Sequence, residues 1–145
     1  MLTKPSHILL SVKIEIIPTD EVYSRWGNYS KFVERATKRS NGRYTPLGIL
    51  YACIDGLMQL WVISDENVVC GVCVTEVNKH PGGLELNIVL LGGDDAERWK
   101  HLLIHIEEWG KEQGCKWAVA QGRRGLPLLL GDDWAETQYI FEKEL

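Results

Sequence analysis

No apolar run in the sequence is long enough to cross a bilayer: the longest are a handful of residues, whereas a transmembrane helix needs roughly 20. A secretory signal is missing too, because residues 1–10 place one lysine, a proline and a histidine before only a short apolar patch. We therefore expect a cytoplasmic protein with no membrane partner.

A strong charge of one sign is also lacking, because 16 basic and 20 acidic side chains give a net charge of −4. Positive charge gathers in residues 28–44, which hold Lys31, Arg35, Lys38, Arg39 and Arg43. Such a patch suits nucleic acid or an acidic partner, but it is more often the solvated face of a helix. The acidic balance of the whole chain argues against nucleic acid, so we expect a solvated face.

Paired metal-binding motifs are absent. Cys70 and Cys73 spell C-x-x-C, but they lie in an apolar, β-branched run typical of a strand, where positions i and i+3 point to opposite faces. His101 and His105 share a predicted helix, on the side away from its apolar stripe and without converging ligands. We expect no bound metal, and reduced cysteines in or near the core.

The composition is that of one globular domain, residues 1–145, in which residues 1–11 could form an extended N-terminal arm. The apolar fraction of 45% and the charged fraction of 25% are globular averages. A chain of this length buries about 68–70% of the surface that its unfolded form exposes. The length is therefore sufficient for one sizeable core.

Hydrophobic periodicity and turn residues predict the elements of the first half. We expect a strand at residues 12–17, helices at 20–26 and 29–39, and a third helix that Thr45 caps, Pro46 opens and Gly56 ends. Alternating apolar residues then predict three strands, at residues 59–64, 68–77 and 84–91. Short turns join these strands, which favours an antiparallel meander.

The strongest helical pattern lies at residues 94–112. Its apolar stripe consists of Ala96, Trp99, Leu102, Leu103, Ile106 and Trp109. A strand at residues 116–120, a short helical turn at 126–130 and a final strand at 135–144 follow. The whole order predicts an α+β fold, with a mixed and mostly antiparallel sheet flanked by helices.

Several short segments spread along the chain carry a family resemblance. They are Arg39-Ser40-Asn41-Gly42-Arg43-Tyr44-Thr45, Met58-Gln59-Leu60-Trp61-Val62, Leu90-Leu91-Gly92-Gly93-Asp94-Asp95, Glu107-Glu108-Trp109 with Gly114-Cys115, and Gly122-Arg123-Arg124-Gly125. With this element order, the chain resembles the GCN5-related N-acetyltransferase (GNAT) fold, and more narrowly GNAT-like proteins of tailed bacteriophages and prophages. The resemblance runs from about Lys13 to the end of the chain.

The resemblance implies where acetyl-coenzyme A (acetyl-CoA) would bind. GNAT members hold its pyrophosphate with backbone N–H groups at the turn from the fourth strand into the long helix, where a helix N-terminus attracts anions. Gly92 and Gly93 stand at that turn and could let the backbone approach a phosphate. The arginine or glutamine that usually precedes the glycines is missing, and the carboxylates of Asp94 and Asp95 would repel a pyrophosphate.

The resemblance also implies a base and an acid. GNAT enzymes often use a glutamate on the central strands as base and a tyrosine on the short late helix as acid. Glu85 and Glu76 lie on strands, and Glu85 is the candidate base, although a solvated strand residue is the commoner case. The late helix at residues 126–130 has no tyrosine. Tyr139 lies on the predicted last strand, where we expect it to pack.

Arg123 and Arg124 form the most ligand-like surface in the sequence, since paired guanidinium groups suit a phosphate or a carboxylate. An ion pair with the acidic second half of the chain explains them equally well. We expect a GNAT-like protein without efficient acetyltransfer and without a cofactor, which acts through contacts with a phage or host protein in virion assembly or host interaction. It would lie in the bacterial host cytoplasm, free or with the virion. The alternative is an acetyl-CoA-dependent N-acetyltransferase of unknown acceptor.

Overall fold

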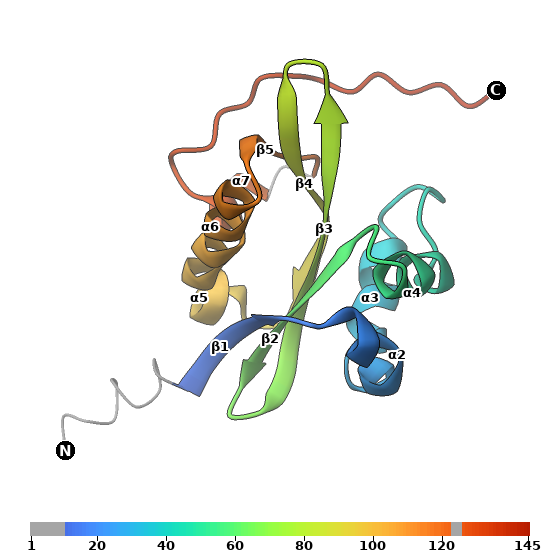
Figure 1. Ribbon diagram of the computed structural model, residues 1–145, viewed down its shortest axis with the longest axis vertical. Helices are drawn as coiled ribbons and strands as arrows, with labels where there is room; N and C mark the ends of the chain where they lie inside the picture. Colours follow the sequence, from blue (N-terminus) through green and yellow to red (C-terminus); the bar gives the residue numbers. More distant parts are fainter. Residues whose placement is uncertain (1–10, 123–125) are drawn as a thin grey trace.

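The computed structural model describes residues 11–122 and 126–145. The strands are β1 (Val12–Ile16), β2 (Gln59–Asp65), β3 (Val68–His80), β4 (Gly83–Gly93) and β5 (Cys115–Ala120) (Figure 1). The α-helices are α2 (Val22–Arg25), α3 (Ser30–Thr37), α4 (Pro46–Ile54), α5 (Ala96–Trp99), α6 (Ile104–Glu112) and α7 (Leu126–Leu130). Three 3-10 helices join them: η1 (Thr19–Glu21), η2 (Trp26–Asn28) and η3 (Lys100–Leu103). The arm expected at residues 1–11 lies, except for Ser11, outside the described residues.

The strands form one five-stranded sheet in the order β1-β2-β3-β4-β5. Strands β1 to β4 pair antiparallel with their neighbours in sequence, whereas β5 pairs parallel with β4 after the chain has crossed back through α5 and α6. The predicted meander and the mixed, mostly antiparallel sheet are therefore confirmed.

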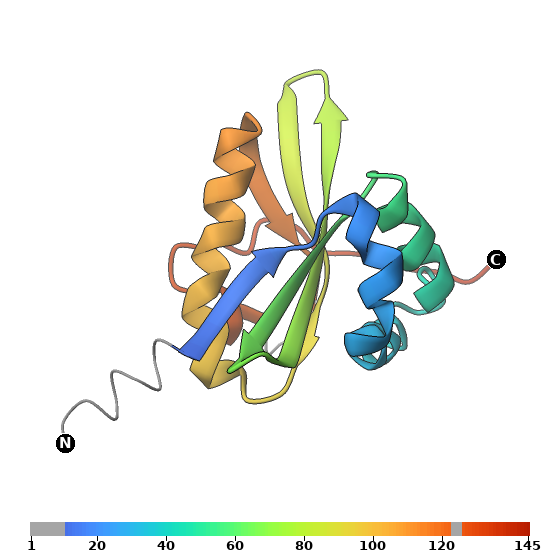
Figure 2. The same ribbon diagram turned by 60° about the horizontal axis from the view of Figure 1, so that its bottom comes forward.

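Helices cover both faces of the sheet, and each face has its own apolar core (Figure 2). On one face α2, α3 and α4 bury Phe32, Val33 and Ile49 against Leu60 and Val72. On the other, α5 and α6 pack a stripe that includes Trp99, Leu103 and Ile106, all at most 5% exposed. The predicted stripe thus faces the sheet as expected. No helix in the described part of the chain is long and apolar enough to span a membrane.

The start and the end of α4 follow directly from the local sequence. The Thr45 hydroxyl oxygen accepts a hydrogen bond from the Gly48 N–H at 3.0 Å, which satisfies one of the free donors of the first turn. Pro46 occupies the first helical position, where no N–H is needed. Gly56 has φ +75°, a conformation in which a side chain would be strained, so the chain turns away there.

The long helix expected at residues 94–112 is interrupted. It begins as one turn of α-helix in α5, tightens to the 3-10 helix η3, and becomes regular only in α6. Tighter 3-10 turns have poorer hydrogen-bond geometry than α-helix. The stripe still reaches the sheet, but the regular α-helix that directly follows the turn after β4 is only the four residues of α5.

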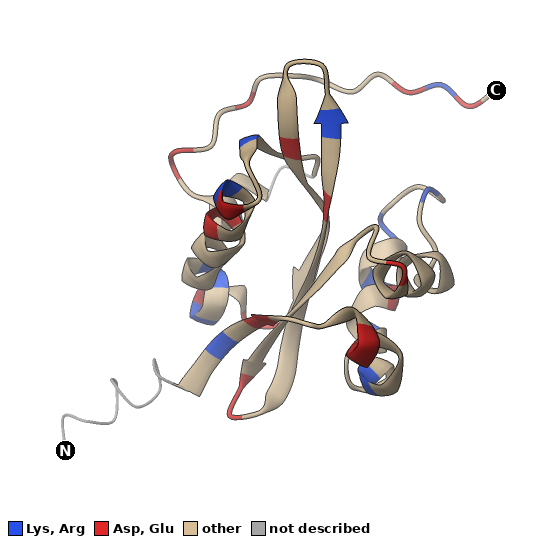
Figure 3. Cartoon of the chain, viewed as in Figure 1, with Lys and Arg blue, Asp and Glu red and all other residues tan. Residues whose placement is uncertain are grey.

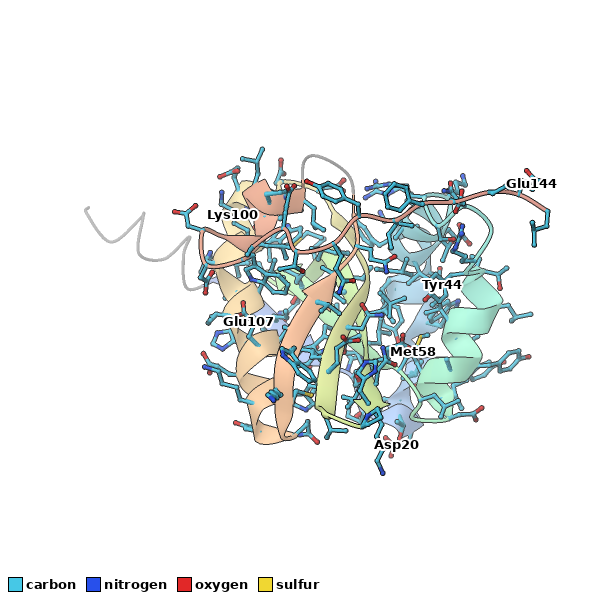
Figure 4. All side chains as sticks on the ribbon, turned by 90° about the horizontal axis from the view of Figure 1, so that it is seen from above. Asp20, Tyr44, Met58, Lys100, Glu107 and Glu144 are labelled. Carbon is cyan, nitrogen blue, oxygen red and sulfur yellow. The ribbon has the colours of Figure 1, made fainter. Side chains whose placement is uncertain are left out.

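The final strand predicted at residues 135–144 is wrong, because the chain is extended there but pairs with no strand among the described residues. Tyr139, expected to pack on that strand, is 79% exposed. Just before this segment, the half-buried Trp134 packs against the core on the α5–α6 face, and an ion pair joins Glu142 to Arg43 before α4. Its path from one helical layer to the other leads across the end of the sheet rather than along an edge (Figures 1 and 4).

Candidate functional site

The turn from β4 into α5 is held tightly against β3. Gly93 pairs with Gly71, and a Cβ atom on Gly93 would overlap the Cys70 carbonyl oxygen and lie 2.6 Å from the Gly71 Cα. Only glycine can approach another backbone so closely. Gly93 thus serves the contact between β3 and β4, whereas a Cβ on Gly92 would reach ordinary contact distance from Ala36.

Asp94 is fixed at three of its groups. Its N–H donates to the Cys70 carbonyl at 2.8 Å, and its own carbonyl accepts the Trp99 indole N–H at 2.8 Å. Its carboxylate accepts a hydrogen bond from the Arg35 guanidinium at 3.1 Å. Residues from three elements therefore hold Asp94, and its N–H is not available to another ligand.

Asp95 and α5 complete the turn. Asp95 has φ 54°, in the left-handed region, and its carbonyl accepts the Arg98 N–H at 2.9 Å. The helix dipole that would attract an anion comes here from four residues only, and two carboxylates precede them. These residues do not fit a pyrophosphate, because negative charge, an occupied donor and a short helix all oppose it.

A cavity of about 340 Å³ beside this turn is also acidic. Four carboxylates and one guanidinium line it, from Asp65, Glu66, Asp94, Asp95 and Arg98. Asp65 is ion-paired with Arg98 and accepts a hydrogen bond from Ser11 at 2.7 Å. The remaining excess of negative charge repels a phosphate further.

A row of four polar side chains lies on the β3–β4 hairpin, on the face that carries α3 and α4. We call it the hairpin ladder; its members are Glu76, Asn78, Glu85 and Asn87. The Asn87 amide donates to Glu76 at 3.1 Å, and the Asn78 amide donates to Glu85 at 3.4 Å. His80 Nε2 lies 3.3 Å from Glu85. Both carboxylates are thus held in place by neighbours on the sheet.

Aromatic side chains flank the hairpin ladder. Burial, and then the negative charge of Glu76, raise the pKa of Tyr44. Figure 4 shows Tyr44 and Met58 between the hairpin and α4. On the other side Trp117 pairs in register with Glu85 and is 42% exposed. The ladder is therefore bordered by two aromatic rings, an arrangement suited to a polar ligand with an apolar body.

Glu85, the candidate base, is more enclosed than a solvated strand residue, since its side chain is 21% exposed. It lies near the start of β4, and Gly92 and Gly93 lie at the other end of the same strand. Residues 123–125 fall outside the described residues, so the predicted anion contacts of Arg123 and Arg124 are not placed.

The sequence missed three irregularities that shape this region, one of which makes Lys116 an extra residue in β5 beside Glu85. Ile63 pairs with Gly71 but Ser64 with Val69, so Cys70 is an extra residue in β3; Val89 is likewise extra in β4. Because of the bulge, Cys70 packs beside the same core as Cys73, and the prediction that they point to opposite faces is wrong. Gly71 directly follows Cys70, but no glycine or proline adjoins Val89. Among the described residues, no cluster of His, Cys, Asp or Glu could hold a metal ion.

The basic patch of the first half lies along the outer side of α3 and the loop after it (Figure 3). All five of its side chains are exposed, as predicted for a solvated face: Lys31, Arg35, Lys38, Arg39 and Arg43. Two of them form ion pairs within the molecule, Arg35 with Asp94 and Arg43 with Glu142. The patch is thus partly neutralised.

No protein-family sequence model matches the chain, and no curated protein sequence does. Solved structures do match. An aminoglycoside acetyltransferase, meta-AAC0020, from an uncultured soil metagenomic sample in complex with sisomicin has a TM-score of 0.71 at 15% identity, over 95% of this chain and 99% of that one.

A GCN5-related N-acetyltransferase from Ralstonia eutropha JMP134 has a TM-score of 0.66 at 17% identity, over 92% of this chain and 98% of that one. Aminoglycoside N-acetyltransferase AAC(6')-Iy, in complex with CoA, has a TM-score of 0.63 at 10% identity, over 92% and 95%. The chain therefore has the fold of the GNAT acetyltransferases, as the sequence resemblance predicted.

Proposed function

We propose that this chain is a GNAT-fold protein that does not transfer acetyl groups efficiently and acts through contacts with another protein. The observation that carries the proposal is the turn after β4, where the family resemblance implies the pyrophosphate would bind: Asp94 and Asp95 place two carboxylates there, and the Asp94 N–H is bonded to Cys70. Folds are reused without their chemistry, so the fold is compatible with this role. The partner proposed is a phage or host protein, on the strength of the sequence resemblance.

The size of the electrostatic effect supports the proposal. A unit charge about 4 Å from another costs on the order of 1 kcal/mol in water and about 4 kcal/mol at an effective dielectric of 20. Every 1.4 kcal/mol is about a tenfold change in affinity. Two carboxylates facing a pyrophosphate would therefore weaken coenzyme binding by several orders of magnitude, and Arg35 offsets part of one of them.

Calorimetry with acetyl-CoA tests the proposal. We expect no micromolar binding by the unmodified chain, and binding at least about tenfold tighter by the Asp94→Asn/Asp95→Asn variant. The matched control is Asp20→Asn/Asp55→Asn, which removes the same charge at two exposed positions away from the turn and should change nothing. Micromolar binding by the unmodified chain would contradict the proposal.

The second candidate is an acetyl-CoA-dependent N-acetyltransferase, and the hairpin ladder favours it. Two held carboxylates beside Tyr44 and Trp117 could take a proton from an amine and bind a cationic acceptor. Sisomicin, the ligand named in the soil acetyltransferase structure, is a suitable probe. Mass spectrometry should find acetylated sisomicin with the native chain and less with Glu85→Gln. No product from the native chain under saturating acetyl-CoA would exclude sisomicin as the acceptor, and no acetyl-CoA binding in the calorimetry would exclude this candidate.

A further inference from the structure

A second cavity lies on the face of the sheet that carries α2, α3 and α4, since Tyr29 and Val62 of that core line it. Its volume is about 450 Å³, within the roughly 300–1,000 Å³ of small-molecule sites. Strands β1, β2 and β3 and the segment from α2 to α3 supply the polar part of its lining, which consists of Lys13, Glu15, Arg25, Asn28, Ser64 and Asn67. The acidic cavity beside the turn after β4 lies on the other face, where Val12 and Trp99 line it.

The new cavity contains a buried hydroxyl group that bonds to nothing. Ser64 is only 5% exposed, and its side chain has no hydrogen-bond partner in the part of the chain that the structure describes. No side-chain nitrogen or oxygen in that part is both sealed from solvent and unbonded, so the Ser64 hydroxyl is open to the cavity that it lines. Most buried polar groups have a partner. The hydroxyl is therefore available to a ligand.

Two further donors stand beside this hydroxyl. Lys13 pairs in register with Ser64 on the neighbouring strand, so the two side chains leave the same face of the sheet side by side. Lys13 Nζ donates to Asn67 Oδ1 at 3.3 Å, and the amide NH₂ of Asn67 has no partner among the described residues. An ammonium, a hydroxyl and an amide thus form a donor end of the cavity, which suits an oxyanion.

The donor end carries one positive charge that is not neutralised. Arg25, the other cation of the lining, is held by Glu15 at 2.9 Å and by Glu21 at 3.6 Å. Lys13, in contrast, is in no ion pair with the described residues. Hydrogen bonds from a cation to a carboxylate are roughly twice as strong as neutral ones. One free positive charge therefore favours a ligand with one negative charge.

Three valines give the same cavity an apolar side. Val62 is 2% exposed and Val69 is half-buried, whereas Val68 is 69% exposed and leaves an apolar surface in contact with water. Covering that surface with an alkyl chain is favourable. A phosphate has no apolar part and would leave the valines uncovered. The combination of one free charge with an apolar wall indicates a ligand that has both an anionic group and a carbon chain.

We propose that this cavity binds a small aliphatic carboxylate. The carboxylate group accepts hydrogen bonds from Lys13, Ser64 and Asn67, and the alkyl chain lies against the three valines. This inference goes beyond the proposed function and holds whether or not the chain binds acetyl-CoA, because neither Asp94 nor Asp95 lines the cavity.

Titration of the full ¹⁵N-labelled chain with hexanoate, followed by NMR, tests the proposal. We expect saturable shifts of the backbone amides of Lys13, Ser64 and Asn67, with a dissociation constant of about 1 mM or tighter. Hexanamide, which lacks the charge, and acetate, which lacks the chain, should each bind at least about tenfold more weakly. An absence of saturable shifts at these amides, or tighter binding of inorganic phosphate than of hexanoate, would overturn the proposal.

Charge variants at the donor end test the position of the carboxylate. Lys13→Met removes the free charge, and Asn67→Asp places a second carboxylate beside that of the ligand, so each should weaken hexanoate binding at least about tenfold. The matched control is Lys79→Met, which removes the same charge at an exposed position of β3 outside the cavity and should leave the affinity unchanged. An equal loss with Lys79→Met would contradict the proposed site.

The variant Ser64→Ala separates ligand binding from folding. It should weaken hexanoate binding, but it should leave the free energy of unfolding of the unliganded chain unchanged or higher, because the hydroxyl loses no partner. Urea unfolding without ligand measures this second effect. A Ser64→Ala variant that is less stable than the native chain, or that binds hexanoate equally well, would contradict the role given to this hydroxyl.

Discussion

Two glycines of this chain have opposite surroundings, and together they test how closely β3 and β4 approach. A Cβ on Gly93 would meet backbone atoms of Cys70 and Gly71, which cannot move away as a side chain could, whereas a Cβ on Gly27 would have nothing within 4 Å. We expect Gly93→Ala to lower the free energy of unfolding by about 1–3 kcal/mol. Gly27→Ala should be neutral or raise it by up to about 1 kcal/mol.

Urea unfolding followed by circular dichroism measures both variants. Equal stabilities for Gly93→Ala and the native chain would mean that the two strands are further apart than the structure has them. Acetyl-CoA calorimetry on Gly93→Ala would show in addition whether loosening the turn changes its affinity for the coenzyme.

At the scale of residues, the sequence located the turn but not its contacts. Gly92, Gly93 and the two aspartates are visible as a pattern, and the charge that they place at the turn follows from the pattern alone. The bonds from Asp94 to Arg35 and Cys70 join residues far apart in sequence, and no local spacing predicts them. The bulge at Cys70 was missed for the same reason, because it depends on the register with β2.

Among the elements, the stability of α4 depends on its N-terminal cap rather than on charged side chains, because none of its nine residues is charged. Thr45→Ala removes the acceptor for the Gly48 N–H and should lower the free energy of unfolding by about 1 kcal/mol. Thr45→Ser keeps the hydroxyl and should retain most of the free energy of unfolding that Thr45→Ala loses. Thermal unfolding of the three proteins checks this; an alanine variant as stable as the native chain would mean that the cap contributes nothing.

Elements with a strong periodic pattern were predicted well, and those decided by tertiary contacts were not. The strands of the meander and the helices α3 and α4 have the expected places because each has an apolar stripe of its own. Residues 135–144 also have a strand pattern, but a strand needs an edge to pair with, and anchors at Trp134 and Glu142 keep this segment from one in its own chain.

For the molecule as a whole, buried thiols make stability depend on alkaline pH. Burial raises the pKa of Cys53 to about 12 and that of Cys73 well above its ordinary value. In the unfolded chain both thiols ionise near the ordinary thiol pKa of 9.0, so the unfolded state loses protons first. The contribution that the two neutral thiols make to stability is fully present below pH 9 and is lost as the pH rises toward 12.

The expected slope is at most about 1.4 kcal/mol per pH unit for each thiol. Urea titrations at pH 7, 9 and 10 measure it. The Cys53→Ala/Cys73→Ala variant, although less stable at every pH, should lose less on going from pH 9 to pH 10. An equal loss in both proteins would assign the alkaline transition to other groups, such as Tyr29, whose pKa burial raises to about 12.

The bracing of the turn also bears on how such a protein can evolve. A mutation at Asp94 alone removes a charge, but it leaves the N–H bonded to Cys70 and leaves Arg35 without its carboxylate. A mutation at Asp95 alone leaves Asp94 in place. Each single substitution therefore removes only part of what opposes coenzyme binding, and substituting both aspartates should raise the affinity more than either substitution alone. If the proposed function holds, a lineage with this turn would gain coenzyme binding only slowly, because no single substitution at the turn supplies it.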